Sequence, residues 1–332
     1  MKKLINDPFE VTIQEIEGFV AAFPREVRRV GTQSVARSSA PKAGKVGVIF
    51  GGGSGHEPLF MGYLGPGMAD ACPVGNIFTS PAPGVVLEAT LAVSGGAGVI
   101  YLYGNYAGDV MNFDMAAEMA AEEGIHVETV LITDDVASAP LEQKSRRRGI
   151  AGDFFVLKAA GACAEANGSL EQVRAAAAKA NDNTRSMGVA LSSCIIPASG
   201  RPIFELGADE IEIGLGIHGE PGERRQKLAP ADDITDQLVD RILEDSLFRT
   251  GDEVAVLVNG LGATPLAELF IVFRRVAARL SQAGMHIHRS YVGEYSTSLE
   301  MAGCSVTLLR LDDELRRWIN WPASTPYFTQ TN

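Results

Sequence analysis

Two histidines flanked by glycines are the residues of this sequence best suited to chemistry on a small ligand. His56 lies in the glycine-rich segment 51–58, directly after an apolar run, and His218 lies in segment 214–222, after an alternating run. Glycine lacks a Cβ atom, so the backbone of each segment can approach a ligand closely. Asp109 ends a third segment of the same kind. Two imidazoles and a carboxylate at the ends of strands indicate a site for hydroxyl and carbonyl chemistry.

The segment at 51–58 matches neither of the common nucleotide-binding loops. A dinucleotide-binding loop has the pattern GxGxxG, but Pro58 takes the place of the third glycine, and the Gly-Lys-Ser/Thr of a Walker A loop is missing. A structural turn needs one or two glycines, whereas this segment combines four with Ser54 and His56. Consecutive backbone N–H groups, a hydroxyl and an imidazole suit a small polyhydroxylated ligand.

His218 and Asp109 each have two interpretations. The His218 imidazole is a good nucleophile if an acceptor holds one ring nitrogen, and either Glu220 or a residue distant in sequence could be that acceptor. Alternatively, His218 caps a turn. Asp109 could act as a general base for a hydroxyl, or it could be an N-cap or Asx-turn residue ahead of a helix that begins near Met111.

The elements that position His56 and Asp109 alternate between strands and helices. Strands are predicted at 46–50, 98–103 and 127–133, and helices at 12–23, 85–93, 113–123, 150–167 and 169–180. Ser169 and Gln172 form a capping box at the start of the last helix. This alternation predicts an N-terminal α/β layered domain with a mostly parallel sheet, at residues 1–185. Ligands of parallel sheets bind outside the carboxyl ends of the strands, where Asp109 lies.

The rest of the chain, at 186–332, is richer in strands and carries His218. Strands are predicted at 187–194, 203–206, 210–217, 253–258, 287–291 and 306–309. One strong helix is expected at 265–282, with Thr264 as its cap and Pro265 at its first position. We therefore expect a second domain of the α+β type.

Composition narrows the classes of function. The formal net charge of −12 argues against nucleic-acid binding, which needs a basic surface. There is no apolar run of about 18 residues to cross a membrane and no apolar signal-peptide core, so we expect a cytoplasmic protein without membrane association. The four cysteines are far apart and form no CxxC pair, and His286 and His288 have no evident third ligand, so no metal site is expected.

Four segments together resemble a known family. They are GGGSGHEP at 51–58, GNYAGD at 104–109 with the Asn-Phe pair at 112–113, RGIAG at 148–152, and GLGIHGEPG at 214–222. In this order they resemble the substrate-binding subunit of dihydroxyacetone kinases over nearly the whole chain. The resemblance implies a two-domain α/β fold that usually dimerises. It also implies a phosphotransferase with an alcohol group as acceptor, of which this chain is one component and inactive alone.

The resemblance also implies roles for individual residues. His218 would add through its ring nitrogen to the carbonyl of a short ketose, giving a covalent hemiaminal, whereas glycerol has no carbonyl to accept it. The residues that would hold the substrate are Gly53, Ser54, Gly55, Gly104 and Asn105. Asp109 would activate the terminal hydroxyl, and His56 would support that proton transfer.

By the same resemblance, the nucleotide and its Mg²⁺ belong on a separate helical subunit. We expect no cofactor on this chain, because it ends about 20 residues after its last predicted strand, too soon for a further domain. The partner subunit would use ATP, or would keep ADP bound and be recharged by a protein of the phosphotransferase system.

One position departs from the family pattern. Many members have a lysine before the Asn-Tyr pair, and here it is Gly104, which leaves room for a four-carbon ketose such as erythrulose. Two alternatives remain: a regulatory paralogue that senses a ketose without phosphorylating it, and a purely structural α/β protein. Asp109 favours the enzyme, because sensing requires His218 but no base.

Overall fold

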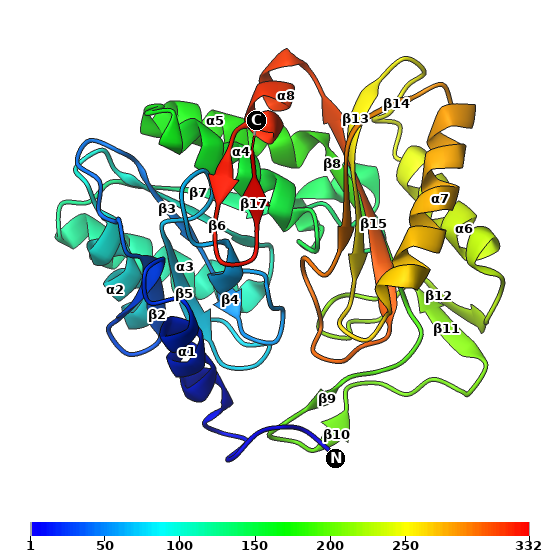
Figure 1. Ribbon diagram of the computed structural model, residues 1–332, viewed down its shortest axis with the longest axis horizontal. Coiled ribbons are helices and arrows are strands. Elements are labelled where there is room, and N and C mark those ends of the chain that lie inside the picture. The colour runs from blue at the N-terminus through cyan, green and yellow to red at the C-terminus, as the bar shows by residue number, and fades with distance from the viewer. Residues whose placement is uncertain (1, 332) are drawn as a thin grey trace. The chain divides into compact units, whose positions relative to one another are not determined.

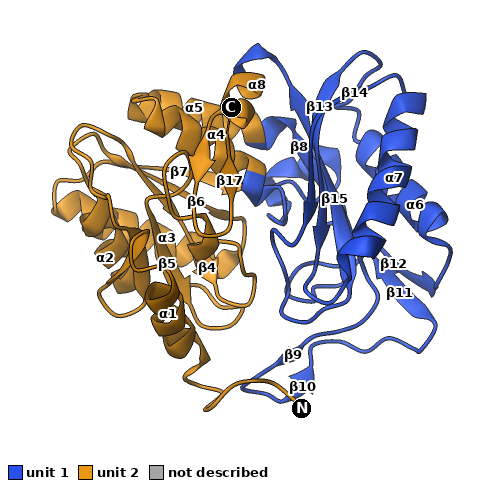
Figure 2. Cartoon of the chain, viewed as in Figure 1, with its two compact units in different colours: residues 1, 133–154, 181–314 blue, residues 2–132, 155–180, 315–332 orange. Residues whose placement is uncertain are grey.

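In the computed structural model, which describes residues 2–331, the chain forms two compact units (Figures 1 and 2). The N-terminal unit consists of residues 2–132, 155–180 and those from Leu315 onward. The C-terminal unit consists of residues 133–154 and 181–314. The sequence suggested a single boundary at 185, whereas the chain passes between the units four times. Residues 1 and 332, the outer limits of the two expected domains, lie outside the described residues.

Helix α4 (Asp153–Glu165) shows why a single boundary was expected. Its sequence is apolar almost all round, so its periodicity does not tell which part of the chain covers it. In the structure the buried amine of Lys158 donates to the carbonyl oxygens of Trp318 (3.1 Å) and Trp321 (2.6 Å). These contacts tie the helix to the last residues of the chain, within the N-terminal unit.

The N-terminal unit is built on a seven-stranded sheet whose principal order is β1-β2-β5-β3-β6-β7, with β4 paired to β5. Its strands are β1 (Val27–Val30), β2 (Ser34–Arg37), β3 (Gly47–Phe50), β4 (Gly52–Gly53), β5 (Ala71–Gly75), β6 (Val99–Gly104) and β7 (Val127–Ile132). All pairs from β5 to β7 are parallel, and β1 and β2 are antiparallel additions. The mostly parallel sheet is therefore confirmed.

Helices of the N-terminal unit pack on this sheet through small and aromatic side chains. Val86 and Ala89 of α2 and Phe113 of α3 share a core cluster with Tyr101 and Tyr103 of β6. Besides α4, the helices are α1 (Val11–Ala22), α2 (Pro83–Val93), α3 (Ala107–Glu122), α5 (Leu170–Asn183) and α8 (Asp313–Asn320), with the 3₁₀ turn η1 (Met61–Tyr63) and a small hairpin of β16 (Ala323–Ser324) and β17 (Thr329–Gln330). A second 3₁₀ turn, η2 (Leu141–Arg146), belongs to the C-terminal unit. Some of these elements begin or end at a boundary between the units.

The capping box predicted at the start of α5 is confirmed. The Ser169 N–H donates to the side-chain oxygen of Gln172 (2.9 Å), and the Gln172 N–H donates to the Ser169 hydroxyl (3.3 Å). These two bonds satisfy N–H groups that a helix start otherwise leaves unpaired.

The C-terminal unit is the expected strand-rich α+β domain. Its six-stranded sheet has the order β12-β11-β8-β15-β13-β14, and only the pair β13–β14 is parallel. The strands are β8 (Thr184–Ala190), β11 (Glu210–Ile213), β12 (Arg224–Lys227), β13 (Glu253–Gly260), β14 (His286–Gly293) and β15 (Gly303–Leu311). Helices α6 (Ala231–Leu243) and α7 (Leu266–Gln282) lie side by side and pack into a core with β8, β13 and β15 (Figure 1).

The local predictions for this unit differ from the structure in several places. Helix α6 was missed, although Ile234, Leu238 and Ile242 recur at helical spacing on its buried face. The strand predicted at 203–206 does not form; a short hairpin of β9 (Ile195–Ile196) and β10 (Arg201–Pro202) precedes it. Pro265 is the N-cap of α7 and not its first helical residue. Thr264 is not the cap, because its hydroxyl donates to the carbonyl of Gly303 (2.7 Å) and accepts the Gly303 N–H (2.8 Å).

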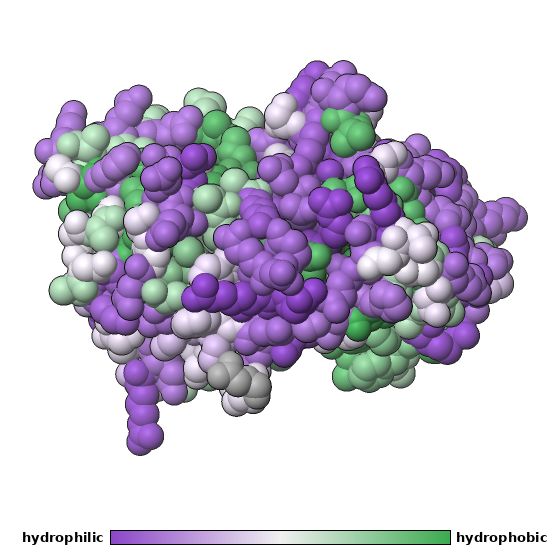
Figure 3. Space-filling view, turned by 90° about the horizontal axis from the view of Figure 1, so that it is seen from above, coloured by the Kyte–Doolittle hydropathy of each residue, from purple (hydrophilic) through white to green (hydrophobic). Residues whose placement is uncertain are grey.

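Hydrophilic side chains cover much of the face shown in Figure 3, and the apolar side chains on it form separate patches. Charged pairs join the exposed sides of α6 and α7, where Arg275 and Arg279 pair with Asp236. Within residues 2–331, no helix is both long and apolar enough to cross a membrane.

Candidate active site

The glycine-rich loop follows strand β3 and is fastened by backbone hydrogen bonds. The Ser54 N–H donates to the carbonyl of Gly75 (3.1 Å), and the Phe78 N–H donates to the carbonyl of Ser54 (3.0 Å). A Cβ atom at Gly53 would lie 2.6 Å from the backbone nitrogen of Thr79, so only glycine fits this close approach. The loop is thus held against the segment that precedes α2.

His56 is almost completely buried, with 1% of its surface exposed. Its ring is stacked on that of Phe78, with centroids 4.8 Å apart and planes inclined by 20°. The Phe60 ring meets His56 edge-on at 6.4 Å. The two aromatic contacts fix the plane of the imidazole.

Helix α1, from a distant part of the sequence, supports the loop, a contact that no pattern in the sequence predicts. The hydroxyls of Thr12 and Ser54 lie 3.0 Å apart. The carboxyl groups of Glu15 and Glu57 share a hydrogen bond, and both oxygens of Glu57 accept the N–H of Gly55 (2.9 and 3.1 Å). Burial, followed by the charge of Glu57, raises the pKa of Glu15 to about 10, so one proton stays in this pair at neutral pH.

Asp109 is the third residue of helix α3, whose N-cap is Tyr106. The helix therefore begins four residues before Met111, and the N-cap interpretation of Asp109 is wrong. An acidic side chain in the first turn interacts favourably with the helix dipole. Strands β3 and β6 are parallel neighbours, with Phe50 opposite Leu102, so the His56 loop and Asp109 follow strands that end at the same edge of the sheet.

The segment after Phe78 connects these two parts of the N-terminal unit. The Asn112 side-chain amide donates to the carbonyl of Pro81 (2.9 Å), and a Cβ at Gly108 would meet the Ser80 side chain at 3.5 Å. Gly104 is the last residue of β6, and the Asn105 N–H donates to the carbonyl of Ile132 (3.1 Å). All predicted site residues other than His218 thus belong to the N-terminal unit.

His218 belongs to the C-terminal unit, in a tight turn after β11. The Gly216 N–H donates to the carbonyl of Glu220 (3.0 Å), and Gly219 has a φ of +83°, which favours glycine. The Nδ1 atom of His218 lies 2.9 Å from one carboxylate oxygen of Glu220, and the His218 N–H donates to the other oxygen (3.0 Å). Glu220, one of the acceptors considered for the His218 ring, therefore contacts it in the structure.

The ionisation of Glu220 determines which nitrogen of His218 carries a proton. Burial acts to raise the pKa of Glu220, but the hydrogen bond and charge of His218 and the charge of Arg148 outweigh it, so the pKa is lowered to about 2. A carboxylate can only accept hydrogen bonds, so Nδ1 is the protonated nitrogen. In the neutral ring the basic lone pair then lies on Nε2.

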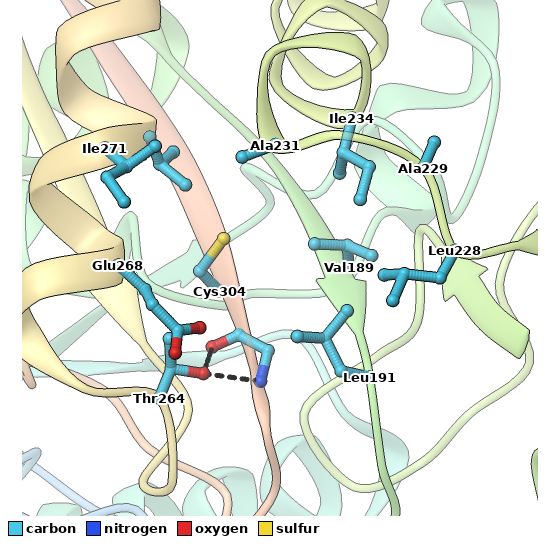
Figure 4. Close-up of a pocket in the computed structure, with 12 residues that line it drawn as sticks. Val189, Leu191, Leu228, Ala229, Ala231, Ile234, Thr264, Glu268, Ile271 and Cys304 are labelled. Carbon is cyan, nitrogen blue, oxygen red and sulfur yellow. Dashed lines mark hydrogen bonds between the residues drawn. The ribbon is translucent and has the colours of Figure 1, made fainter. Parts of the chain in front are cut away.

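An apolar pocket lies elsewhere in the C-terminal unit and contains none of the predicted site residues (Figure 4). Its volume is about 160 Å³. Side chains from β8, α6 and α7 surround it, and Cys304 and Glu268 point into it. Among the described residues, no group of three or more histidine, cysteine or acidic side chains could hold a metal ion.

Comparison with known proteins gives consistent matches along the chain. The family model described as the Dak1 domain matches residues 17–327. The dihydroxyacetone-binding subunit DhaK of PTS-dependent dihydroxyacetone kinase 2 from Listeria innocua is 49% identical, over 99% of both chains. A D-erythrulose kinase from Mycolicibacterium smegmatis is 45% identical over 99% of this chain, which spans 56% of that protein.

Two solved structures each match nearly the whole of this chain. The dihydroxyacetone kinase of C. freundii in complex with AMP-PNP and Mg²⁺ has a TM-score of 0.91 and 34% identity, over 99% of this chain and 61% of that one. The structure described as the dihydroxyacetone kinase operon co-activator Dha-DhaQ has a TM-score of 0.90 and 30% identity, over 98% of this chain and 100% of that one.

Proposed function

Because the chain belongs to the Dak1 family of dihydroxyacetone kinases, we propose that it is the ketose-capturing subunit of a two-component ketose kinase. Its substrate would be dihydroxyacetone or a related short ketose. The observation that carries this proposal is the pairing of His218 with Glu220, because it makes Nε2 the nucleophilic nitrogen of a histidine in a glycine turn.

The capture step is an addition without a leaving group. The Nε2 lone pair forms a bond to the carbonyl carbon, the C=O π pair moves to the oxygen, and that oxygen gains a proton. Solvent supplies the proton that the oxygen gains, and the ring releases its Nδ1 proton to solvent by way of the Glu220 carboxylate, which ends ionised as it began. The adduct is a neutral hemiaminal whose added mass is that of one intact ketose. Glycerol cannot form it, because it has no carbonyl.

Phosphorylation requires a second set of groups. We assign Asp109 as the base that accepts the proton of the terminal hydroxyl, and His56 as the residue that supports this transfer. The backbone of Gly53 and Gly55, the Ser54 hydroxyl, Gly104 and Asn105 are the proposed contacts to the substrate. The ring contacts of His56 with Phe78 support this assignment, since a catalytic side chain needs a fixed orientation.

A four-carbon ketose is a candidate substrate beside dihydroxyacetone. Relatives named D-erythrulose kinase and L-erythrulose 1-kinase are 45% and 43% identical to this chain. Gly104 adds no side chain at the end of β6, so it leaves space that a lysine would occupy. An extra hydroxyl of the ketose would use that space.

The phosphoryl group would come from a separate helical subunit that carries the nucleotide and Mg²⁺. Relatives named PTS-dependent support a phosphotransferase-system protein as the ultimate donor, whereas direct use of ATP is the other possibility. We further propose that the chain works in the cytoplasm as a homodimer and binds neither nucleic acid nor membrane.

A regulatory function is the second candidate, favoured by one specific observation. The structure described as an operon co-activator matches this chain as well as the kinase does, with TM-scores of 0.90 and 0.91. A sensor of this kind would capture the ketose on His218 and would not need Asp109.

Reconstitution separates the two functions. The chain with ATP, Mg²⁺ and dihydroxyacetone should give no ketose phosphate by ³¹P NMR, and product should appear when a nucleotide-bearing subunit of the family is added. Robust turnover by the chain alone would contradict the two-component function. Capture without turnover, with either ketose and either phosphoryl donor, would favour the sensor.

A further inference from the structure

We propose that Arg148 and Asp135 are positioning residues that orient the Glu220 carboxylate, and thereby set the tautomer of His218. This inference rests on the proposed function, in which Nε2 of His218 is the nucleophile. Arg148 begins the RGIAG segment, to which the sequence assigned no role.

The Arg148 guanidinium is anchored on its inner side by Asp135. Both Nε (2.9 Å) and Nη2 (2.8 Å) of Arg148 contact the same carboxylate oxygen of Asp135, of whose side chain only 1% is exposed. The other oxygen of Asp135 accepts the N–H of Ala137 (3.0 Å). The carboxylate therefore has a fixed orientation, and so does the guanidinium that it holds.

The backbone ties the same two residues together a second time. The Asp135 N–H donates to the carbonyl of Arg148 (3.1 Å), and the Arg148 N–H donates to the hydroxyl of Ser138 (3.0 Å). That hydroxyl donates to the carbonyl of Asp135 (2.8 Å). The backbone of Arg148 is thus held in place, and its side chain extends from there to the turn that carries His218.

The outer side of the guanidinium faces the turn that carries His218. Its Nη2 donates to the carbonyl of Gly214 (3.3 Å), and its Nη1 lies 4.0 Å from the Oε2 atom of Glu220. A Cβ atom at Gly216 would lie 2.2 Å from that Oε2 and 2.7 Å from Nη1. Glycine at 216 therefore provides the space in which cation and carboxylate approach each other.

The two oxygens of Glu220 then have separate partners. Oε1 contacts Nδ1 of His218, while Oε2 accepts the backbone N–H of His218 and faces Arg148. The cation stabilises the ionised carboxylate and orients it, so that Oε1 receives the Nδ1 proton. Without it, the carboxylate is free to turn, and the imidazole populates both tautomers.

The tautomer can be measured directly, without any ketose. In protein labelled with ¹⁵N-histidine, at about pH 8 where imidazoles are ordinarily neutral, the two-bond ¹H–¹⁵N pattern shows which ring nitrogen is protonated. His218→Ala identifies the His218 signals. We expect the Nδ1–H form in the wild type and a mixture of both forms in Arg148→Gln and Asp135→Asn. Arg148→Lys, which restores the charge, should recover part of the wild-type pattern.

Arg146→Gln is the matched control. Arg146 is exposed on the preceding 3₁₀ turn and contacts Gln143, so its removal should leave the His218 signals unchanged. The other four histidines report in each variant whether the fold is intact. If Arg148→Gln destabilises the protein, Asp135→Asn and Arg148→Lys carry the test.

Ketose affinity provides the second readout. Arg148→Gln should weaken capture by about tenfold, the loss expected when a charge-assisted contact is removed. An unchanged His218 tautomer in folded Arg148→Gln and Asp135→Asn would overturn the positioning role. Absence of a ketose adduct in the wild type would instead overturn the proposed function. The tautomer measurement would still be valid, because it is made without ketose.

Discussion

The rings of His56 and Phe78 lie nearly parallel, with centroids 4.8 Å apart. Phe78 has a φ of +56°, a conformation that is uncommon outside glycine, and its N–H is bonded to the carbonyl of Ser54. The stack therefore joins the glycine-rich loop to the segment that precedes helix α2, whose Pro81 carbonyl accepts a hydrogen bond from Asn112 of α3. Through this contact, Phe78 packs against one face of the imidazole and fixes the orientation of the ring.

Replacing Phe78 with leucine should lower kcat without abolishing ketose capture. A stacked aromatic pair contributes about 0.5–1.5 kcal/mol, which corresponds to a loss of about two- to tenfold if that contact orients His56 for proton transfer. Steady-state kinetics with the partner subunit, beside intact-protein mass spectrometry of the adduct, measures both effects. An unchanged kcat would mean that the stack only fills the core.

Asp109→Asn should keep ketose capture and lose phosphorylation. Loss of a general base costs about 10²–10⁴-fold in rate. Asp114→Asn is the matched control, because Asp114 is an exposed carboxylate on the same helix. Turnover of Asp109→Asn at the wild-type rate would reduce Asp109 to a helix-start residue and favour the sensor.

Gly104→Lys should shift substrate preference toward the three-carbon ketose. The added cation would donate to substrate hydroxyls, and hydrogen bonds to charged groups contribute about 1.5–3 kcal/mol. The lysine stem would also take up the space proposed for a fourth carbon. The measurement is the ratio of kcat/KM for erythrulose and dihydroxyacetone with a fixed partner subunit. If the ratio does not move, position 104 does not select the substrate.

Glu15→Gln should flatten the pH dependence of stability. Because burial raises the pKa of Glu15 from 4.5 to about 10, the folded state keeps a proton that the unfolded chain releases above pH 4.5. The stabilising contribution is complete below pH 4.5 and is lost as the pH rises toward 10, with a slope of at most about 1.4 kcal/mol per pH unit.

Urea denaturation between about pH 6 and 9 measures this slope, which lies inside the window set by the two pKa values. Glu15→Gln keeps a neutral donor to Glu57 but cannot ionise, so its free energy of unfolding should fall less with pH. Glu17→Gln, an exposed neighbour on α1, serves as the control. Equal slopes in wild type and Glu15→Gln would show that Glu15 is already ionised at neutral pH.

Local sequence patterns predicted many of the helices and strands. They did not predict how these elements pack together, because packing depends on residues far apart in the sequence. The apolar runs at 46–50 and 98–103 became the parallel strands β3 and β6, because buried parallel strands are apolar on both faces. Strand β1 was missed, since Val27–Val30 has two arginines at its centre and no apolar run. The path of α4 into the N-terminal unit depends on partners more than 150 residues away.

The candidate site likewise contains residues that the sequence predicted and supporting residues that only the structure revealed. Glycine patterns and the HGEP segment pointed to His218 and to Glu220 as one possible acceptor, and the structure brings these two together. The supports from Glu15 and Asp135 are tertiary contacts, and no spacing in the sequence connects them to the loops they hold. Phe78 has no sequence signal either, because an isolated aromatic residue usually indicates core packing.

The most direct test of the account is the mass of the intact protein incubated with dihydroxyacetone. We predict a reversible increase equal to one intact ketose in the wild type, no increase with glycerol, and no increase in His218→Ala. His286→Ala, at an exposed histidine on β14, should form the adduct as the wild type does. An adduct that persists in His218→Ala would place the nucleophile on another residue and contradict the central claim.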